Sequence, residues 1–451
     1  MCRSFLMPAR FAPRTHLGYT AYMHSNRKKA QHIWIVFLVT LLTTVTVGVL
    51  LIYALFGKKE APDTSAPPES VSPAVTNTVT ARIEKIEPTP VPEPVSEEET
   101  ETEPEVESRY GAILADEEFC RENHIYSREA ASEDEIRLLF AGDISLADGY
   151  AIVVTLKSAG GDIASAFSAE TLNAMRDADV FMLNNEFTYS RRGEPTAEKQ
   201  YTFRANPDNV HYLDDMGADI VSLANNHTYD YGEISLLDTL DTLEGDDMPY
   251  VGAGRNIEEA ARPVYYIVND VKIGYISATQ IERQPNPDTR GATDNSAGTF
   301  RCWYDDRILD VISDMKKNCD YVIAYIHWGT ELETDTDWAQ DDLAPKLAGA
   351  GADLIIGDHP HILQKLDYIG DTPVIYSLGN YWFNSKTQDT GLLEVVLNRD
   401  ADTTAVRFIP AIQSGCRTSM AAGEEKARIL EFMRSISLNV DIDPDGYVTK
   451  R

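Results

Sequence analysis

Residues 351–361 read GADLIIGDHPH, a short apolar run that ends abruptly in charged and imidazole side chains. The run 354–356 is typical of a buried strand, and Asp358, His359 and His361 follow its carboxyl end. Four other strand-like runs also end in polar tips: 136–141 before Gly142-Asp143, 180–183 before Asn185-Glu186, 220–224 before Asn225-Asn226-His227, and 321–326 before His327-Trp328-Gly329. Because parallel strands gather their carboxyl ends at one edge of a sheet, we expect these tips to converge.

The tips combine carboxylates, an amide and imidazoles, a mixture of ligands that suits a divalent transition metal. Each residue alone has a more ordinary interpretation. Asp143 or Asn226 could cap a helix or a turn, and His227 or His327 could be a hydrogen-bonded core histidine. Taken together, the residue types fit one coordination chemistry, which favours a metal site.

Strand-like and helix-like runs alternate from residue 136 to residue 451, which predicts an α/β domain with helices on both faces of a sheet. Residues 110–135 are interpreted as a lead-in segment with some helix. Within the domain, the patterns predict helices at 232–244, 338–347 (with Asp337 as N-cap) and 424–436, strands at 272–278 and 374–378, and a hairpin of 392–397 with 405–409.

Residues 33–56, IWIVFLVTLLTTVTVGVLLIYALF, carry no charge and exceed the roughly 20 apolar residues that a membrane-spanning helix needs. The alternative is a cleaved signal peptide. The apolar run is longer than a typical signal-peptide core, and no small-x-small cleavage site follows it, which favours a retained transmembrane helix. Residues 1–32 form a basic tail, so the positive-inside rule predicts a cytoplasmic N-terminus and an extracellular C-terminal domain, with single-pass anchoring in the cell membrane.

Residues 57–109 are rich in proline and glutamate and contain no aromatic residue, which predicts a disordered linker that acts as a tether. The formal net charge of the whole chain is −32. Such an acidic body is unsuited to nucleic acid, which requires basic surface. The five cysteines show no Cys-x-x-Cys spacing. Free buried cysteines are therefore the simpler expectation, although the predicted compartment permits a disulfide.

The tips resemble those of the CapA family, the bacterial capsule or poly-γ-glutamate synthesis proteins. The matching segments occur in the family's order: FAGD at 140–143, NNE at 184–186, SLANNH at 222–227 with DYG at 230–232, HWGTE at 327–331, GADLIIGDHPH at 351–361 and IYSLGN at 375–380. That family is in turn similar to the calcineurin-like metallophosphoesterases. The resemblance therefore implies a layered α/β/β/α metallophosphatase-like fold over residues 136–451 and a metal centre.

Carried over residue by residue, the resemblance implies a set of metal ligands: Asp143, Glu186, Asn226, His327, His359 and His361. His227, paired with Asp230, would be the catalytic proton donor. The implied cofactor is one or two divalent ions of Mn, Fe or Zn. Ser145 stands where the superfamily has the histidine of its Asp-x-His motif, so we expect a single metal or a weak pair instead of a tight binuclear centre.

Three further residues are candidates for binding substrate. Residues 147–149 (ADG) stand where family members commonly have Gly-Arg, and Arg204 is the nearest replacement for that cation. Glu331 could act as an acid or base or contact the substrate, but it could equally be a surface carboxylate. Asn380 could touch a ligand or bridge two loops.

The implied function is that of a membrane-anchored extracellular component of capsular polymer synthesis, export or anchoring. Its partners would be an anionic polymer of the poly-γ-glutamate type or other polymer-synthase subunits. An acidic body suits a polyanion poorly, unless a metal or a local basic patch such as Arg191-Arg192 compensates. The alternative is a metal-dependent hydrolase that cleaves a phosphoester or a polymer amide. A domain that keeps the fold and has lost the chemistry is a third reading.

Overall fold

The structure is a computed structural model that describes residues 108–281 and 289–451. The predicted cytoplasmic tail, the transmembrane helix at 33–56 and nearly all of the linker lie outside these residues. Within the part that is described, no helix is both long and apolar enough to cross a membrane.

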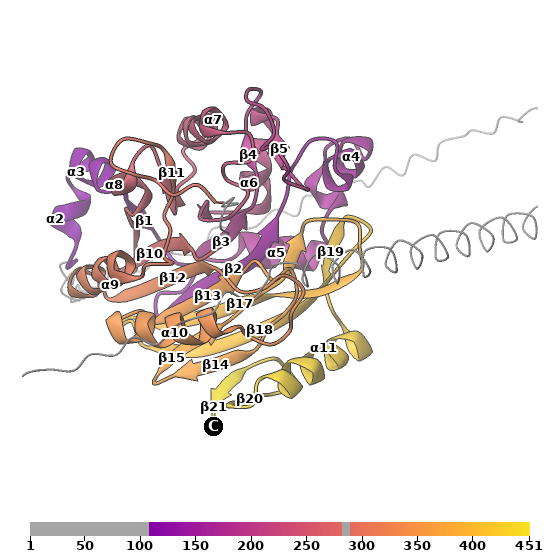
Figure 1. The fold of residues 1–451 in the computed structure, drawn as a ribbon. Helices are drawn as coiled ribbons and strands as arrows, with labels where there is room; N and C mark the ends of the chain where they lie inside the picture. The colour runs from indigo at the N-terminus through magenta and orange to yellow at the C-terminus, as the bar shows by residue number, and fades with distance from the viewer. Residues whose placement is uncertain (1–107, 282–288) are drawn as a thin grey trace, which may run out of the picture. The chain divides into compact units, whose positions relative to one another are not determined.

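Two mixed sheets form the centre of the domain (Figure 1). The first has eight strands, in the order β19 (Arg417–Met420), β18 (Thr403–Ser414), β17 (Gln388–Asn398), β2 (Glu135–Ile144), β3 (Val180–Asn185), β6 (Ile220–Ser222) and β7 (Tyr250–Val251), with β16 (Asn380–Trp382) paired to β2. The second has seven, in the order β1 (Ile125–Arg128), β9 (Val264–Val268), β10 (Val271–Thr279), β12 (Tyr321–His327), β13 (Leu354–Asp358), β15 (Thr372–Ile375) and β14 (Leu366–Ile369).

The strands that carry the polar tips are parallel to one another within each sheet. In the first sheet β2, β3 and β6 run in parallel, and in the second β10, β12 and β13 do so. Their carboxyl ends therefore lie at common edges, as the sequence predicts. The apolar runs are continuous because each strand is buried on both faces.

The alternation of side chains along β2 shows how the layers are built. Leu138 and Phe140 point into a core that the two sheets share, whereas Leu139 and Ala141 face the helices that cover the first sheet. Those helices are α4 (Ala151–Ser158), α5 (Ala169–Arg176), α6 (His211–Met216) and α7 (Glu233–Gly245). Helices α9 (Asp306–Asn318) and α10 (Trp338–Ala350) cover the second sheet. The order of layers is thus α/β/β/α, as expected.

The remaining elements are short or peripheral. Helix α11 (Gly423–Ile436) and the hairpin β20 (Val440–Ile442) and β21 (Val448–Lys450) extend the core between the sheets. In Figure 1, α11 lies on the opposite side of the sheets from α6 and α7. The lead-in segment contains α2 (Gly111–Leu114), α3 (Glu117–Glu122) and β1. The others are η1 (Ile163–Ser165), β4 (Thr188–Tyr189), β5 (Arg204–Ala205), η2 (Pro207–Val210), β8 (Ala253–Gly254), α8 (Ile257–Ala260) and β11 (Gly298–Thr299).

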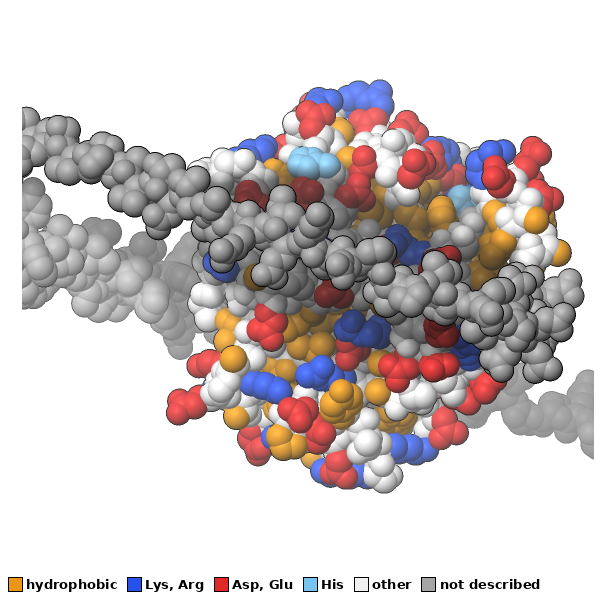
Figure 2. Space-filling model, turned by 180° about the vertical axis from the view of Figure 1, so that it is seen from behind, with side chains coloured by type: hydrophobic (Ala, Val, Ile, Leu, Met, Phe, Trp, Pro, Cys, Tyr) orange, Lys and Arg blue, Asp and Glu red, His pale blue; other side chains and the backbone are white. Residues whose placement is uncertain are grey.

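The predicted helices and the hairpin are confirmed. Helix α10 begins after Asp337, whose side chain accepts hydrogen bonds from the backbone amides of Ala339 and Gln340, and Gln340 completes a capping box. Strands β17 and β18 pair antiparallel. Among the described residues, Cys120, Cys319 and Cys416 form no disulfide; Cys416 is buried, and the other two are partly exposed. On the face drawn in Figure 2, basic side chains are interspersed among acidic ones, so the negative charge is spread over that face.

Candidate metal centre

The register of the two sheets brings the polar tips together. Asp143 near the end of β2 pairs with Asn184 of β3, and Glu186 follows directly after β3. In the second sheet His327, the last residue of β12, pairs with Asp358, the last residue of β13. These side chains from both sheets meet at one place, and all of them are buried.

Glycines allow the close backbone approaches that position two of these carboxylates. A Cβ atom on Gly142 would lie 2.0 Å from the carbonyl oxygen of Gly379, and one on Gly357 would lie 2.2 Å from Trp328 Nε1. Any other residue would therefore push Asp143 or Asp358, which follow directly, out of place.

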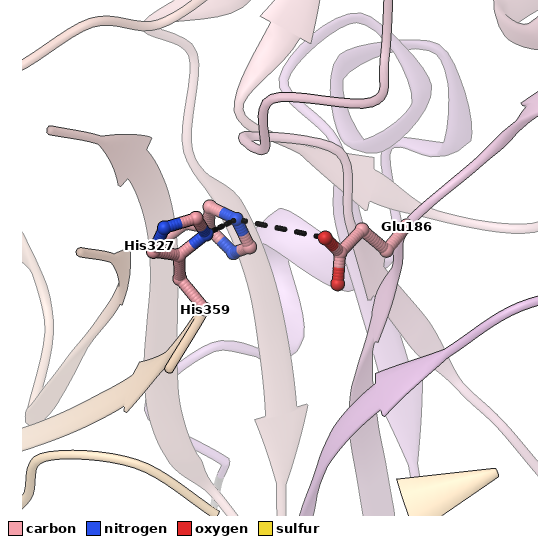
Figure 3. A group of neighbouring side chains, drawn as sticks. All are labelled: Glu186, His327 and His359. Carbon is pink, nitrogen blue, oxygen red and sulfur yellow. Dashed lines mark hydrogen bonds and ion pairs between the residues drawn. The ribbon is translucent and has the colours of Figure 1, made fainter. Parts of the chain in front are cut away.

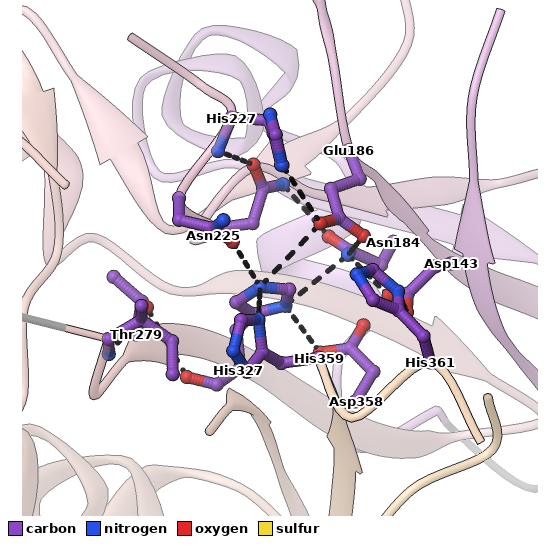
Figure 4. Close-up of polar contacts among 12 residues, drawn as sticks. Asp143, Asn184, Glu186, Asn225, His227, Thr279, His327, Asp358, His359 and His361 are labelled. Atoms are coloured by element: carbon purple, nitrogen blue, oxygen red, sulfur yellow. Dashed lines mark hydrogen bonds and ion pairs between the residues drawn. The ribbon is translucent and has the colours of Figure 1, made fainter. Parts of the chain in front are cut away.

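The turn after β13 is strained. His359 and His361 have φ angles of 96° and 61°, in the left-handed region that residues with a Cβ rarely adopt. Each such residue costs roughly 1–3 kcal/mol and persists only where the surroundings impose it. The result is that both imidazoles face the cluster at the ends of β2, β3 and β12 (Figure 4).

Three overlapping groups of side chains place their ligand atoms within 4.8 Å of one another: Glu186 with His327 and His359, Asp143 with Glu186 and His361, and Asp143 with His327 and Asp358. Figure 3 shows the first group, in which the Glu186 carboxylate faces the two imidazoles. Asn226 Oδ1 lies 2.7 Å from His327 Nε2. All six predicted metal ligands therefore meet in one cluster.

His361, one of the predicted ligands, lies beside Asp143. His361 Nδ1 lies 3.1 Å from Asp143 Oδ2 and shares a group with Glu186. Among the described residues, His361 thus brings one imidazole to Asp143, and the expectation of a single ion or a weak pair stays a prediction.

The two ring nitrogens of His327 face different partners. Its Nδ1 lies 2.7 Å from Asp358 Oδ1, and its Nε2 lies 3.0 Å from His359 Nδ1. Burial lowers the pKa of His327 to about 3, so the ring is neutral and carries a single proton, on Nδ1 or on Nε2. With the proton on Nδ1, Nε2 and the Oδ1 atom of Asn226, 2.7 Å apart, are two acceptors that face each other. A bound cation would satisfy both atoms.

The buried carboxylates also favour the binding of a cation. Burial raises the pKa of Glu186 well above its ordinary value, and the nearby carboxylates of Asp143 and Asp358 raise it further. Glu186 Oε1 has no hydrogen-bond partner among the described residues. Burial opposes ionisation of Asp143 as well, yet hydrogen bonding from His361 holds the pKa of Asp143 well below its usual range. The residues present fit a divalent cation bound by oxygen and nitrogen ligands.

A hydrogen-bonded amide network orients the carboxylate of the first sheet. Asn184 Nδ2 donates to Asp143 Oδ1 at 2.8 Å, and Asn225 Nδ2 donates to Asn184 Oδ1 at 3.0 Å (Figure 4). Asn225 Oδ1 accepts from the backbone amide of His227. Both asparagines lie within the sequence motifs, but the motifs alone assign them no role.

His227 and Asp230 form a pair beside the cluster, as predicted. His227 Nδ1 donates to Asp230 Oδ2 at 2.7 Å, which leaves Nε2 3.7 Å from Glu186 Oε1. Burial lowers the pKa of His227. Lys199 Nζ donates to Asp230 Oδ1 at 2.6 Å, and the backbone amide of Phe203 donates to Asp230 Oδ2. Sequence analysis missed Lys199, which lies in an irregular stretch between β4 and β5 and belongs to no motif.

The structure places Arg204 outside the cluster. Its guanidinium lies 4.1 Å from the centre of the Tyr231 ring and donates to the carbonyls of Arg192 and Gly193. Arg204 lines a cavity of about 350 Å³ that Asp148 also lines. It therefore lies next to residues 147–149, where family members commonly have Gly-Arg. Arg191 and Arg192 are each paired with an aspartate, Asp208 and Asp238 respectively.

The other two substrate-binding candidates lie near His361. Asn380 pairs in register with Asp143, and its Nδ2 donates to Gln388 Oε1 at 3.3 Å. Glu331 is exposed beyond the end of β12, and its charge is one of the influences that raise the pKa of His361, against the effect of burial. Both residues border the cluster without belonging to its groups of ligand atoms.

Comparison with known proteins points to one family. A family model described as "Bacterial capsule synthesis protein PGA_cap" matches residues 137–385. The PGA biosynthesis protein CapA of Bacillus subtilis (strain 168) is 30% identical over 274 residues, which cover 60% of this chain and 70% of that protein. The capsule biosynthesis protein CapA of Bacillus anthracis is 33% identical over 243 residues, which cover 52% and 57%.

Among solved structures, the 5'-nucleotidase from Candida albicans SC5314 aligns at 11% identity with a TM-score of 0.35, over 63% of this chain and 53% of that one. A likeness at this level carries no functional weight.

Proposed function

This chain belongs to the bacterial capsule synthesis protein family PGA_cap, and we propose that it serves the synthesis, export or anchoring of a capsular polymer of the poly-γ-glutamate type. The observation that carries the proposal is the family match over residues 137–385, which spans the whole cluster from Asp143 to Asn380. In this proposal residues 33–56 anchor the chain in the cell membrane, residues 57–109 act as a tether, and the domain works outside the cell with the polymer or with other synthase subunits.

The test is complementation in a bacterium that produces the polymer and lacks its own gene of this family. We expect the full chain to restore cell-associated polymer. A chain with residues 33–56 deleted should fail, because its domain would not be held at the membrane. Failure of the full chain, although it is present in the envelope fraction, would reject the proposal.

A second candidate function, metal-dependent hydrolysis, is favoured by the buried cluster of carboxylates and imidazoles. Glu186, Asn226, His327 and His359 would hold one divalent ion, and Asp143, Glu186 and His361 could hold another. Bound Mn, Fe or Zn would supply Lewis acidity and lower the pKa of a coordinated water. The bond cleaved would be a phosphoester or an amide of the polymer.

His227 and Asp230 would carry out the proton transfer. Asp230 accepts the Nδ1 proton of His227, so in neutral His227 the Nε2 atom is the one free to take up a proton and return it to a leaving oxygen or nitrogen. Lys199 and the Phe203 amide hold Asp230 in position for this task. Burial of His227 keeps competing water away from the ring.

The hydrolase candidate is tested by assaying the metal-loaded full chain on bis-p-nitrophenyl phosphate and on poly-γ-glutamate. Removal of a general acid–base group typically slows the reaction about 10²–10⁴-fold, and we expect a loss of that size for His227→Ala. An Asp208→Asn variant, altered at an exposed carboxylate paired with Arg191, is the matched control. Equal rates in wild type and His227→Ala, or none in either, would leave only the non-catalytic role.

A further inference from the structure

A cavity of about 290 Å³ opens beside the metal centre. It is lined by Trp303, Gln280, Thr330, Asp337 and His359, among others, and is called here the Trp303 cavity. Gln280 follows Thr279, the last residue of β10. His359 lines the cavity and also belongs to the group of ligand atoms with Glu186 and His327, so the cavity adjoins the metal centre.

Trp303 lines this cavity, and Trp338, which is not part of the lining, packs against Trp303. Trp303 is 42% exposed and Trp338 is 70% exposed, and their rings meet edge to face with centroids 5.7 Å apart. The other two tryptophans in the described residues, Trp328 and Trp382, are fully buried. A pair of large aromatic side chains held at the surface next to a cavity is an apolar area that a ligand would cover.

The charges of the lining exclude two ligand classes. Among the residues that the structure describes, the cavity's lining contains no lysine or arginine, so these residues offer an anionic polymer no cationic partner. Its one carboxylate, Asp337, already accepts hydrogen bonds from the amides of Ala339 and Gln340 and from Thr330 Oγ1. Because Asp337 caps α10, its carboxylate is not available to bind an ammonium group.

Two uncharged polar side chains, Gln280 and Thr330, also line the cavity. Gln280 is buried, and its Oε1 has no hydrogen-bond partner among the described residues. Thr330 contributes a hydroxyl, and Ile281 and Ala339 add apolar surface. An aromatic face with a few neutral hydrogen-bonding groups suits a ligand that has an apolar face and a rim of hydroxyls, and a pyranose ring has that form.

We propose that the Trp303 cavity binds one ring of a neutral saccharide, with Trp303 as the aromatic surface and Trp338 holding the Trp303 ring in place by their edge-to-face contact. Its volume lies near the lower end of ligand pockets, which begin at about 300 Å³, so it suits one ring and not a polymer segment. The inference goes beyond the proposed function, because saccharide binding here requires neither a metal nor catalysis. It would allow the domain to hold a glycan next to His359.

The test is a titration of the full-length protein in detergent, after EDTA treatment, with cellotetraose, maltotetraose and tetra-N-acetylchitotetraose. Tryptophan fluorescence and calorimetry report binding. We expect saturable binding of at least one of these probes and at least a tenfold loss of affinity in Trp303→Ala and in Trp338→Ala. Tyr304→Ala is the matched control, because Tyr304 is 83% exposed next to Trp303 and does not line the cavity.

Thermal unfolding shows whether each variant keeps its fold. If Trp303→Ala does not fold, Trp338→Ala decides, since Trp338 is an exposed residue in the first turn of α10 and alanine is a good helix former. No saturable binding of any of the three probes, or wild-type affinity in the folded tryptophan variants, overturns the proposal. Binding of spermine or of poly-γ-glutamate that depends on Trp303 would assign the cavity to a cation or to the anionic polymer, and would also overturn it. Because EDTA is present, failure of the metal-dependent assays does not affect this result.

Discussion

Replacing Glu186 by glutamine removes a buried charge and preserves the shape of the side chain. Glu186 is fully buried, and its ligand atom lies within 4.8 Å of that of Asp143. Two unit charges at that distance repel by about 3.5 kcal/mol at an effective dielectric constant near 20. Burial and this repulsion raise the pKa of Glu186, which favours its protonated form in the metal-free protein. Glutamine resembles that neutral form, and we expect the free energy of unfolding of the metal-free protein to change by less than about 1 kcal/mol.

The metal-loaded protein should respond differently. An ion present at a hundred times its Kd stabilises the folded state by about 2.7 kcal/mol. With an unfolding entropy of about 2.1 cal/mol/K per residue, a domain of this size should gain about 4 °C in Tm. Differential scanning calorimetry with Mn²⁺ or Zn²⁺ should show this rise in wild type and in the control Glu333→Gln, altered at an exposed carboxylate. The rise should be absent in Glu186→Gln. An equal rise in Glu186→Gln, or a metal-free variant weakened by several kcal/mol, would refute the reasoning.

Three further predictions concern buried polar groups. Asp358→Asn removes the acceptor of the His327 Nδ1 proton, and metal affinity measured by chelator competition should fall about 10–100-fold; unchanged affinity would contradict the orienting role. Lys199→Met leaves the buried Asp230 carboxylate without its cation, and urea unfolding should show a free energy of unfolding lower by about 3–5 kcal/mol. Adding Asp230→Asn should restore most of this loss. A loss that the second substitution does not restore would argue against the pairing. Burial raises the pKa of Asp219 from 3.8 to about 6, so its proton stabilises the fold fully below pH 3.8, and that contribution is lost as the pH rises through 6. Asp219→Asn should remove this fall in stability, and identical pH profiles of wild type and variant would show the assignment to be wrong.

The convergence of the tips could be predicted from the sequence because it depends on local patterns and one topological rule. An apolar run such as 354–356 is recognisable as a strand, and parallel pairing places the ends of neighbouring strands together. Asp358 thereby meets His327, and Asn184 meets Asp143, without any knowledge of the loops. The start of α10 could also be predicted from a local pattern, because the capping residues Asp337 and Gln340 are three residues apart.

The rest depended on contacts that no local pattern encodes. His361 reaches Asp143 across 218 positions, and it does so through a turn in which the backbone adopts left-handed angles. Lys199 lies in a polar stretch without periodicity, so nothing in the sequence connected it with Asp230. Arg204 was predicted to bind substrate because it is the nearest cation to residues 147–149. Its guanidinium packs on the ring of Tyr231, 27 residues later in the chain, and no local pattern indicates that contact.

The most direct test of the metal centre is the anomalous scattering of crystals of this protein grown or soaked with Mn²⁺ or Zn²⁺. We expect an anomalous peak enclosed by Glu186, His327 and His359, at about 2.0–2.2 Å from each ligand atom for zinc. A well-ordered structure in which these three side chains bind no ion at saturating metal would contradict the central claim.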